Sequence, residues 1–182
     1  MILRLIIIPI TILLSPLMLF ISLLILIEDG FPILFSQKRI GINKCKFTIF
    51  KFRTMKKNTG DIPTHLLQNR NLFITNIGYY LRKMSLDELP QLFNIIRGDM
   101  TLIGPRPALY NQEDLINLRE DKGIHSLKPG LTGWAQINGR DEISIIEKVD
   151  FDYYYLKNKN LFLDIKIFFL TIYKVLSRRD IS

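Results

Sequence analysis

The sequence contains one cysteine, Cys45, and two histidines, His65 and His125, among its 182 residues. A single thiol excludes an intramolecular disulfide framework, and so few sulfur and nitrogen ligands exclude the usual structural zinc sites. We expect Cys45 to be a buried, inert thiol and both histidines to lie at the surface. Neither G-x-x-x-x-G-K-S/T nor G-x-G-x-x-G occurs, so the two common phosphate-binding glycine loops are also absent.

Acidic residues are fewer than basic ones. There are 17 Asp and Glu residues against 25 Lys and Arg, for a formal charge of +8. This excess predicts an anionic partner: nucleic acid, a phosphorylated small molecule or an acidic membrane surface. No acidic residue lies between Asp29 and Asp61, a stretch that is rich in lysine and arginine. With 48% hydrophobic and 23% charged residues, the chain is not intrinsically disordered.

The residues from Leu5 to Ile27 form an uninterrupted uncharged segment of 23 residues. A helix needs about 20 such residues to span a bilayer, and the segment is too long for a cleaved signal peptide. Pro16 lies near its centre and should kink a helix, while Ser15 can hydrogen-bond a carbonyl that the break frees. Two interpretations remain open: a kinked spanning helix, and a re-entrant hairpin that turns at Ser15-Pro16. The basic flanks slightly favour the hairpin.

The basic stretch directly follows the apolar segment, so anionic lipid headgroups are its default partner. Within it, hydrophobic alternation predicts two short strands, over 31–35 and 47–52, joined by a turn at 41–43. The second strand would hold Lys51 and Arg53 at fixed positions suited to phosphate. We therefore expect two parts, a membrane segment over residues 1–30 and a globular domain over 31–182.

The remainder of the chain reads as mostly helical. A helix over 71–84 precedes Ser85, which with Glu88 predicts a capping box at the start of a helix that Gly98 ends. Thr101–Pro107 is expected to form a rigid loop. Further helices are expected over 108–122 and 142–157, and the apolar segment 161–176 is short for spanning and suits a helix lying in the membrane interface. The expected fold class is α+β, mostly helical, with a small β element and amphipathic interfacial helices around a compact domain.

Asp87 and Glu88 are adjacent carboxylates in this region. Acids in a first helical turn often only offset the helix dipole. Three arginines, however, lie in or beside restricted backbone segments, and guanidinium groups held in this way match phosphate oxygens. A carboxylate can attack phosphorus, and Asp87 or Asp99 is suited to bind Mg²⁺ together with substrate phosphates. The set therefore predicts transfer of a substituted phosphoryl group; the three arginines are Arg82, Arg106 and Arg140.

Long stretches of the sequence resemble one family, the small bacterial sugar transferases, also called monotopic phosphoglycosyl transferases. The similarity rests on the Ser15-Pro16 break and on four blocks in the expected order. The blocks are KFRTM (51–55), SLDELPQLFNIIRGDMTLIGPRP (85–107), PGLTGWAQINGR (129–140) and YY-x-K-N-x-x-L-x-L-D-I-K-I (154–167). Most members have a basic pair and an acidic residue ahead of the apolar run, whereas this chain has only Arg4 there.

The resemblance implies that the protein moves a sugar-1-phosphate from a UDP-sugar to undecaprenyl phosphate, with Mg²⁺ and release of UMP. It implies a re-entrant N-terminal helix and a catalytic domain on the cytoplasmic face of the bacterial inner membrane. Asp87 would be the nucleophile that forms a covalent phosphosugar intermediate, and Glu88 a metal ligand or proton acceptor. Membrane lipids are expected partners, whereas nucleic acid is not. The sequence does not decide between a monomer and a homo-oligomer.

Two other hypotheses remain open from the sequence. The first is a non-enzymatic, membrane-anchored protein that binds anionic lipid through its basic stretch. The second is a protein with a conventional spanning helix and its domain on the outer side of the membrane.

Overall fold

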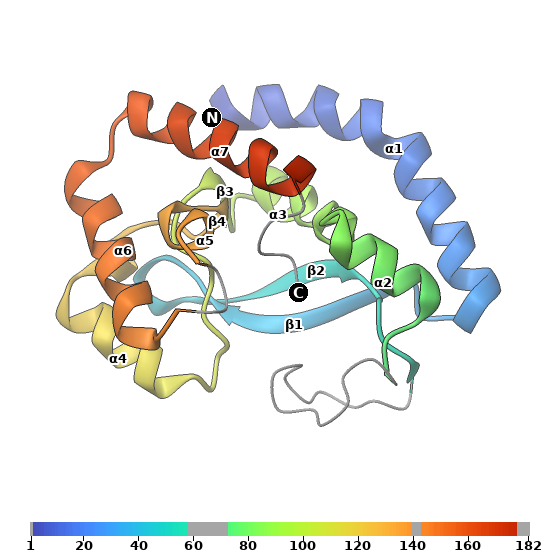
Figure 1. Ribbon diagram of the computed structural model, residues 1–182, viewed down its shortest axis with the longest axis horizontal. Helices are drawn as coiled ribbons and strands as arrows, with labels where there is room; N and C mark the ends of the chain where they lie inside the picture. The colour runs from blue at the N-terminus through green and yellow to red at the C-terminus, as the bar shows by residue number, and fades with distance from the viewer. Residues whose placement is uncertain (1, 58–72, 140–142, 178–182) are drawn as a thin grey trace.

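The computed structural model describes residues 2–57, 73–139 and 143–177, and Figure 1 shows their arrangement. Helices predominate and the two sheets are small, which confirms the expected α+β class. The elements, in order, are α1 (Ile2–Asp29), β1 (Leu34–Ile40), η1 (Ile42–Lys44), β2 (Lys46–Phe52), α2 (Asn76–Lys83), η5 (Leu86–Glu88), α3 (Gln91–Arg97), β3 (Thr101–Ile103), α4 (Glu113–Asp121), η6 (Ile124–Ser126), β4 (Gly130–Thr132), α5 (Trp134–Ile137), α6 (Ile145–Asn158) and α7 (Leu161–Ser177).

The N-terminal helix α1 is continuous over 28 residues and bends along its length (Figure 1). Pro16 lies inside it and has no N–H for the carbonyl of Ile12. The hydroxyl of Ser15 donates to that carbonyl at 2.7 Å, as the sequence predicts for a freed acceptor. The expected break at Ser15-Pro16 is therefore a bend within one helix, and the chain remains helical through the proline.

Both halves of α1 pack on the rest of the molecule. Ile7 belongs to a core cluster with Leu92 of α3, and Ile21 to a second cluster with Leu81 of α2. The opposite side of the helix is apolar and exposed, and the helix is long and apolar enough to cross a membrane. Residues there that are more than half exposed are Leu5, Ile6, Ile12, Leu13, Leu19, Phe20, Leu23 and Ile27.

Polar contacts attach the two ends of α1 to the same body. Near the first turn, the guanidinium of Arg4 donates to the carbonyl of Arg97 at 3.1 Å. Near the last turn, the carboxylate of Glu28 accepts hydrogen bonds from the backbone N–H groups of Asn76 and Ile77 at 2.7 and 3.0 Å. Both ends of α1 are thus held against the rest of the domain.

The strands β1 and β2 form an antiparallel hairpin through the middle of the molecule (Figure 1), with Leu34 paired to Phe52. The turn between them contains Asn43 and Lys44, both with positive φ, so the turn predicted at 41–43 is confirmed. The prediction of a first strand over 31–35 is wrong, since β1 begins at Leu34. Pro32 has no N–H for a ladder, and regular pairing starts after it.

The strands β3 and β4 form a short parallel pair whose backbones are unusually close. A Cβ on Gly104 would lie 2.5 Å from the carbonyl oxygen of Lys128, and Cβ atoms on Gly130 or Gly133 would meet backbone atoms of Gly104. The expectation of a loop over 101–107 is thus wrong for its first three residues. The rest of that segment is held against β4 by these glycines.

Several other local predictions need correction. The helix expected over 108–122 is limited to Glu113–Asp121, because Leu109 bridges to Arg39 and holds the preceding chain extended. Cys45 is exposed rather than buried. His125 is half-buried, with Nε2 bonded to the carbonyl of Ile116 at 3.0 Å. His65 lies outside the described residues.

The last helix, α7, confirms the helix predicted over 161–176. Ile167 is fully buried and Leu163 nearly so, and this side packs on β3, β4 and α5. The other side is apolar and exposed, with Leu161, Phe162, Phe169, Tyr173 and Leu176 more than half accessible. In Figure 1, α7 and the first part of α1 run along the same edge of the molecule.

Candidate functional site

The two adjacent carboxylates, Asp87 and Glu88, lie in the short helix η5 between α2 and α3. Ser85, just before them, adopts the left-handed conformation with φ 54° and makes no capping hydrogen bond. The capping box predicted from Ser85 and Glu88 is therefore wrong; α3 starts only after Pro90. Because the Glu88 side chain does not reach back to cap the backbone, it is available to other partners. Both carboxylates are about nine-tenths buried.

Two cations from distant parts of the chain converge on Glu88. Nζ of Lys51, from β2, lies 2.7 Å from Glu88 Oε1 and 3.9 Å from Asp87 Oδ2. Nη2 of Arg106, from the loop after β3, lies 3.1 Å from the same Glu88 oxygen. The structure thus brings together four of the residues that the sequence singles out. We call Asp87, Glu88, Lys51 and Arg106 the carboxylate cluster.

Burial dominates the ionisation of this cluster. It raises the pKa of Asp87 above its ordinary value. The charge on Lys51 acts in the opposite direction, Glu88 acts in the same direction, and the charges on Arg82 and Arg106 oppose it. Burial also lowers the pKa of Lys51, which the carboxylates partly counter. A buried acid surrounded by cations remains a usable nucleophile, because the cations favour its charged form.

The other predicted basic residues occupy different positions. Arg82, in α2, donates from Nε to the hydroxyl of Thr54 at 2.8 Å and is near enough to act on the pKa of Asp87. Arg53 instead lies at the end of α1, where its guanidinium donates to the carbonyls of Asp29 and Gly30 at 3.1 and 2.7 Å. The contacts described for Arg53 hold α1 in place and do not bring it to the cluster. Arg140 lies outside the described residues.

A buried ion pair that the sequence analysis missed supports Arg106. Nε and Nη2 of Arg119, on α4, donate to Asp152 of α6 at 3.0 and 2.5 Å, and Nη1 donates to the backbone carbonyl of Arg106 at 2.8 Å. Both side chains are almost fully buried. The spacing of the sequence gives one indication that Arg119 is buried. It follows the apolar Leu115 by four residues, which places both on the same side of a helix.

Asn94, also missed, joins α3 to β2. It is fully buried; its side-chain oxygen accepts from the N–H of Phe50 at 3.1 Å, and its amide nitrogen donates to the carbonyl of Thr48 at 2.7 Å. The amide thus pairs with the edge of β2 as a strand would. This connection holds the helix that follows the carboxylates against the strand that carries Lys51.

A cavity of about 220 Å³ adjoins the carboxylate cluster and is lined by two of its four residues. Glu88 and Arg106 lie in its wall, and most of the remaining lining is apolar. This lining comes from the two residues that flank η5, from α3, from the β3–β4 pair, from α5 and from α7. It comprises Ser85, Leu89, Leu92, Leu102, Leu131, Thr132, Gln136, Ile137, Phe168, Thr171, Ile172, Lys174 and Val175. We call this cavity the α3–α7 groove.

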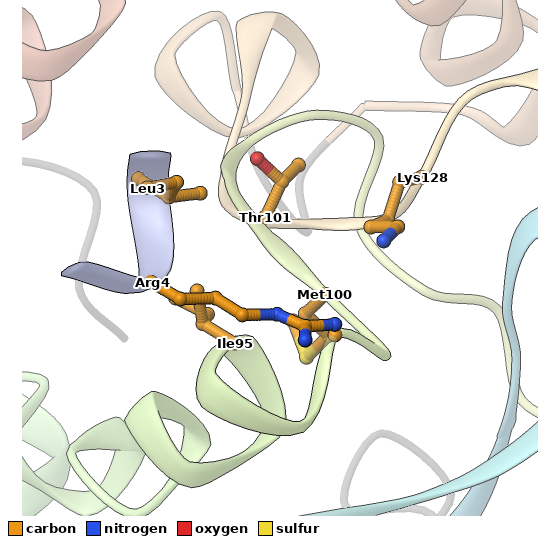
Figure 2. A pocket seen from close by; sticks show the side chains of 7 residues that line it. Leu3, Arg4, Ile95, Met100, Thr101 and Lys128 are labelled. Carbon is orange, nitrogen blue, oxygen red and sulfur yellow. The ribbon is translucent and has the colours of Figure 1, made fainter. Parts of the chain in front are cut away.

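A second cavity, of about 410 Å³, lies near the start of α1 and contains none of the cluster residues. Figure 2 shows Arg4 extending across it past Ile95 and Met100, with Lys128 on the facing segment. The second cavity therefore brings cations together away from the carboxylates. Of the two cavities, the α3–α7 groove is the one lined by members of the carboxylate cluster, namely Glu88 and Arg106.

The described residues contain no group of three or more acidic, histidine or cysteine side chains arranged for a metal ion. Asp87 and Glu88 nevertheless fit Mg²⁺, which commonly takes one or two carboxylates and completes its shell with water and substrate phosphates. Asp99 is less suitable, because its carboxylate pairs with Arg97 at 3.4 Å and accepts a hydrogen bond from the side-chain amide of Asn94 at 3.4 Å.

Comparison with known proteins identifies the chain. The family model described as "Bacterial sugar transferase" matches residues 2–178. The chain is 43% identical to the "Uncharacterized sugar transferase EpsL" of Bacillus subtilis, over 92% of this chain and 82% of that protein. It is 40% identical to the "UDP-glucose:undecaprenyl-phosphate glucose-1-phosphate transferase" of Escherichia coli, over 91% of this chain and 37% of that protein.

A third relative is the "UDP-N-acetylgalactosamine-undecaprenyl-phosphate N-acetylgalactosaminephosphotransferase" of Aeromonas hydrophila, which is 38% identical over 90% of this chain. The chain spans only 40% of that protein's length, so it corresponds to one part of the longer relatives. The match of the family model extends over nearly every residue and includes the carboxylate cluster. The chain belongs to the bacterial sugar transferase family.

Proposed function

We propose that the protein is a phosphoglycosyl transferase that moves a sugar-1-phosphate from a UDP-sugar to undecaprenyl phosphate. The names of the Escherichia coli and Aeromonas hydrophila relatives describe transfers of this type. The observation that carries the proposal is the convergence of Lys51 and Arg106 on Glu88, beside the buried Asp87. A carboxylate pair surrounded by cations suits a reaction whose substrates are both phosphates.

In the proposed first step, a carboxylate oxygen of Asp87 attacks the phosphorus that bears the sugar. The bond from that phosphorus to the oxygen shared with the uridine phosphate breaks, and UMP leaves with both bonding electrons. The product is an aspartyl phosphosugar. Arg106 and Lys51 lie where their charges offset those of the diphosphate, and Glu88 holds both cations in place through its Oε1.

In the proposed second step, a phosphate oxygen of the polyprenyl acceptor attacks the same phosphorus. The bond between Asp87 and phosphorus breaks, which restores the carboxylate and gives undecaprenyl-diphosphate-sugar. Mg²⁺, when bound at Asp87 and Glu88, would neutralise charge on the phosphates. The sequence of two displacements makes each half of the reaction separately measurable.

We propose that the protein works at the cytoplasmic face of the bacterial inner membrane, with α1 re-entrant. Support comes from the polar contacts at both ends of α1, which join Arg4 to Arg97 and Glu28 to α2. A helix attached to one body at both ends, with an exposed apolar side between them, can enter a leaflet without crossing it. The helix α7 also has an exposed apolar side, which suits the interface, and it runs along the same edge of the molecule as the first part of α1 (Figure 1).

The function is tested with the purified full chain in nanodiscs, given undecaprenyl phosphate, Mg²⁺ and a panel of UDP-sugars. We expect UMP release from at least one donor and a mass increase of one sugar-phosphate on the peptide containing Asp87 when the acceptor is omitted. The alternative, a membrane-anchored protein that only binds anionic lipid, predicts no UMP from any donor.

The topology is tested with a single cysteine at the N-terminus, Ile2→Cys, in a Cys45→Ser background, since Cys45 is exposed. A re-entrant α1 predicts that this thiol reacts with a membrane-impermeant reagent only after the inner membrane is opened. Reaction in intact spheroplasts would instead show a spanning helix.

A further inference from the structure

The α3–α7 groove is chemically uneven. Its wall next to the carboxylate cluster carries Glu88 and Arg106, whereas most of the remaining side chains are leucine, isoleucine, valine or phenylalanine. The other polar lining residues are Ser85, Thr132, Gln136, Thr171 and Lys174, and the hydroxyls of Thr132 and Thr171 are paired with each other. The apolar part of this lining offers little to a sugar or a nucleotide, because hydroxyl and base groups need hydrogen-bond partners when they leave water. It suits a hydrocarbon that carries one anionic end.

We propose that the α3–α7 groove binds the phosphate-proximal isoprene units of the polyprenyl phosphate acceptor, with α7 as the wall that determines how the chain is held. The assignment rests on the proposed function, because the acceptor phosphate must reach the phosphorus held at Asp87. With the phosphate beside Arg106, the first isoprene units lie against the leucines of α3 and β4, and against Ile172. Burial of hydrocarbon there stabilises the complex by about 0.8 kcal/mol for each methylene removed from water.

The groove is continuous with the apolar exterior. Phe168 and Ile172 line it and are also 39% and 40% exposed, so they form its outer lip. Beyond them, Phe169, Tyr173 and Leu176 lie on the exposed side of α7. A prenyl chain that leaves the groove over this lip therefore meets the exposed apolar side of α7.

A side-chain hydrogen bond fixes the width of the groove. The hydroxyls of Thr132, on β4, and Thr171, on α7, lie 2.8 Å apart, and the hydroxyl of Thr171 also bonds the carbonyl of Ile167 within α7 at 2.8 Å. Both threonines line the groove. Ile172, the residue after Thr171, is therefore held at a defined distance from the opposite wall.

The kinetic test compares Ile172→Trp with Ile165→Trp in full-length protein in nanodiscs. Ile165 lies on the same helix, is 46% exposed and does not line the groove, so it controls for the bulk of the new side chain. We expect Ile172→Trp to raise the KM for undecaprenyl phosphate by about tenfold, as loss of several buried contacts implies. Exchange of labelled UMP into UDP-sugar without acceptor should stay within about twofold of the parent rate.

Two kinetic results would overturn the assignment: an unchanged acceptor KM in Ile172→Trp, or an equal loss of UMP exchange. Ile172→Ala gives a second readout if the tryptophan variant folds poorly. Removal of the lip side chain should weaken long-chain acceptors more than a short prenyl phosphate, because only the long chain passes over the lip. Equal loss for both acceptors would also contradict the proposal.

A binding test separates failure of the groove from failure of the proposed reaction. A polyprenyl phosphate with a diazirine in its first isoprene units is photolysed with the protein in nanodiscs, and labelled peptides are identified by mass spectrometry. We expect labelling of α7 and of residues 129–137 even if no UMP exchange is detected. Labelling confined to α1, or equal labelling of the groove by a diazirine phosphatidylcholine, would show adventitious contact with bilayer lipid only.

Discussion

Lys51 Nζ lies 2.7 Å from Glu88 but 3.9 Å from Asp87, so the two neighbouring carboxylates are unequally neutralised. One Glu88 oxygen also accepts from Arg106, whereas Asp87 has only the more distant lysine contact in the described ion pairs. Adjacent acids in different environments can serve different roles. Here Glu88 suits holding the cations, and Asp87, with fewer ion-pair contacts, suits the role of nucleophile that we propose for it.

Asp87→Asn should abolish UMP release without destabilising the protein. Activity should fall by about three orders of magnitude or more, since the amide cannot form the intermediate. Because burial raises the pKa of Asp87 from 3.8, the folded protein holds this proton more tightly than the unfolded chain. Stability from this group therefore falls as pH rises from about 3.8 through the folded pKa. Above that pKa, the ionised carboxylate makes the folded protein less stable than a neutral side chain would.

The neutral Asn side chain removes that unfavourable charge, so the melting temperature at pH 7 should equal or exceed the parent value. Asp121→Asn, at the exposed end of α4, is the control and should retain full activity. Retained UMP release by Asp87→Asn would exclude Asp87 as the nucleophile.

Lys51→Met should shift the acid limb of the pH–activity profile to higher pH. The charge on Lys51 lowers the pKa of Asp87 against the effect of burial, so its loss raises that pKa further. Since attack requires the carboxylate, activity should begin to fall at a higher pH than in the parent as the solution is acidified. The measurement is kcat/KM for the UDP-sugar against pH, with Lys46→Met, exposed on the same strand, as control. An unshifted profile would show that Lys51 does not act on Asp87.

Arg119→Met should destabilise the protein by about 3–5 kcal/mol, because it leaves the buried Asp152 carboxylate without its partner. Urea denaturation monitored by tryptophan fluorescence measures this change. The double variant Arg119→Met, Asp152→Leu should recover part of the loss, since no unpaired charge remains. Its activity should stay low, because the carbonyl of Arg106 still lacks the donor that Arg119 provides. Full recovery of activity would exclude a positioning role for Arg119.

Gly104→Ala should destabilise the protein by about 1–3 kcal/mol and reduce activity. The new Cβ would lie against the backbone of Lys128 and Gly130, which cannot move aside as a flexible side chain can. If the segment around Gly104 moves away from the segment 128–130, the loop that carries Arg106 is displaced. Gly123→Ala is the control variant. Gly123 has a φ of +68° but open surroundings, so the substitution should lower the free energy of unfolding by only about 1 kcal/mol and leave activity unchanged. Similar losses in both variants would contradict this explanation.

The sequence predicts the parts of the site that depend on chemistry and local pattern. Asp87, Glu88, Lys51 and Arg106 were all identified from residue type and from family blocks, and the structure brings them together. The bond from Ser15 to a carbonyl freed by Pro16 also follows from local rules. These features involve either neighbouring residues or groups whose charge indicates their use.

Features that depend on tertiary packing were not predictable. Ser85 and Glu88 match a capping box, yet Ser85 adopts the left-handed conformation because Glu88 gains stronger, charged partners from distant segments. Arg53 resembled a phosphate ligand by its place beside Lys51, but the end of α1 provides its partners. The residue types of Asn94 and Arg119 do not indicate their roles, since the partners of both side chains lie far away in the sequence.

The packing of α1 has a consequence for how the protein can be handled. Its inner side supplies Ile7 to one core cluster and Met18, Ile21 and Ile25 to another. A truncated chain that lacks this helix would leave those clusters open to water, and aggregation is the expected outcome. A soluble version is therefore better sought by replacing the exposed leucines and isoleucines of α1 with polar residues than by deleting the helix.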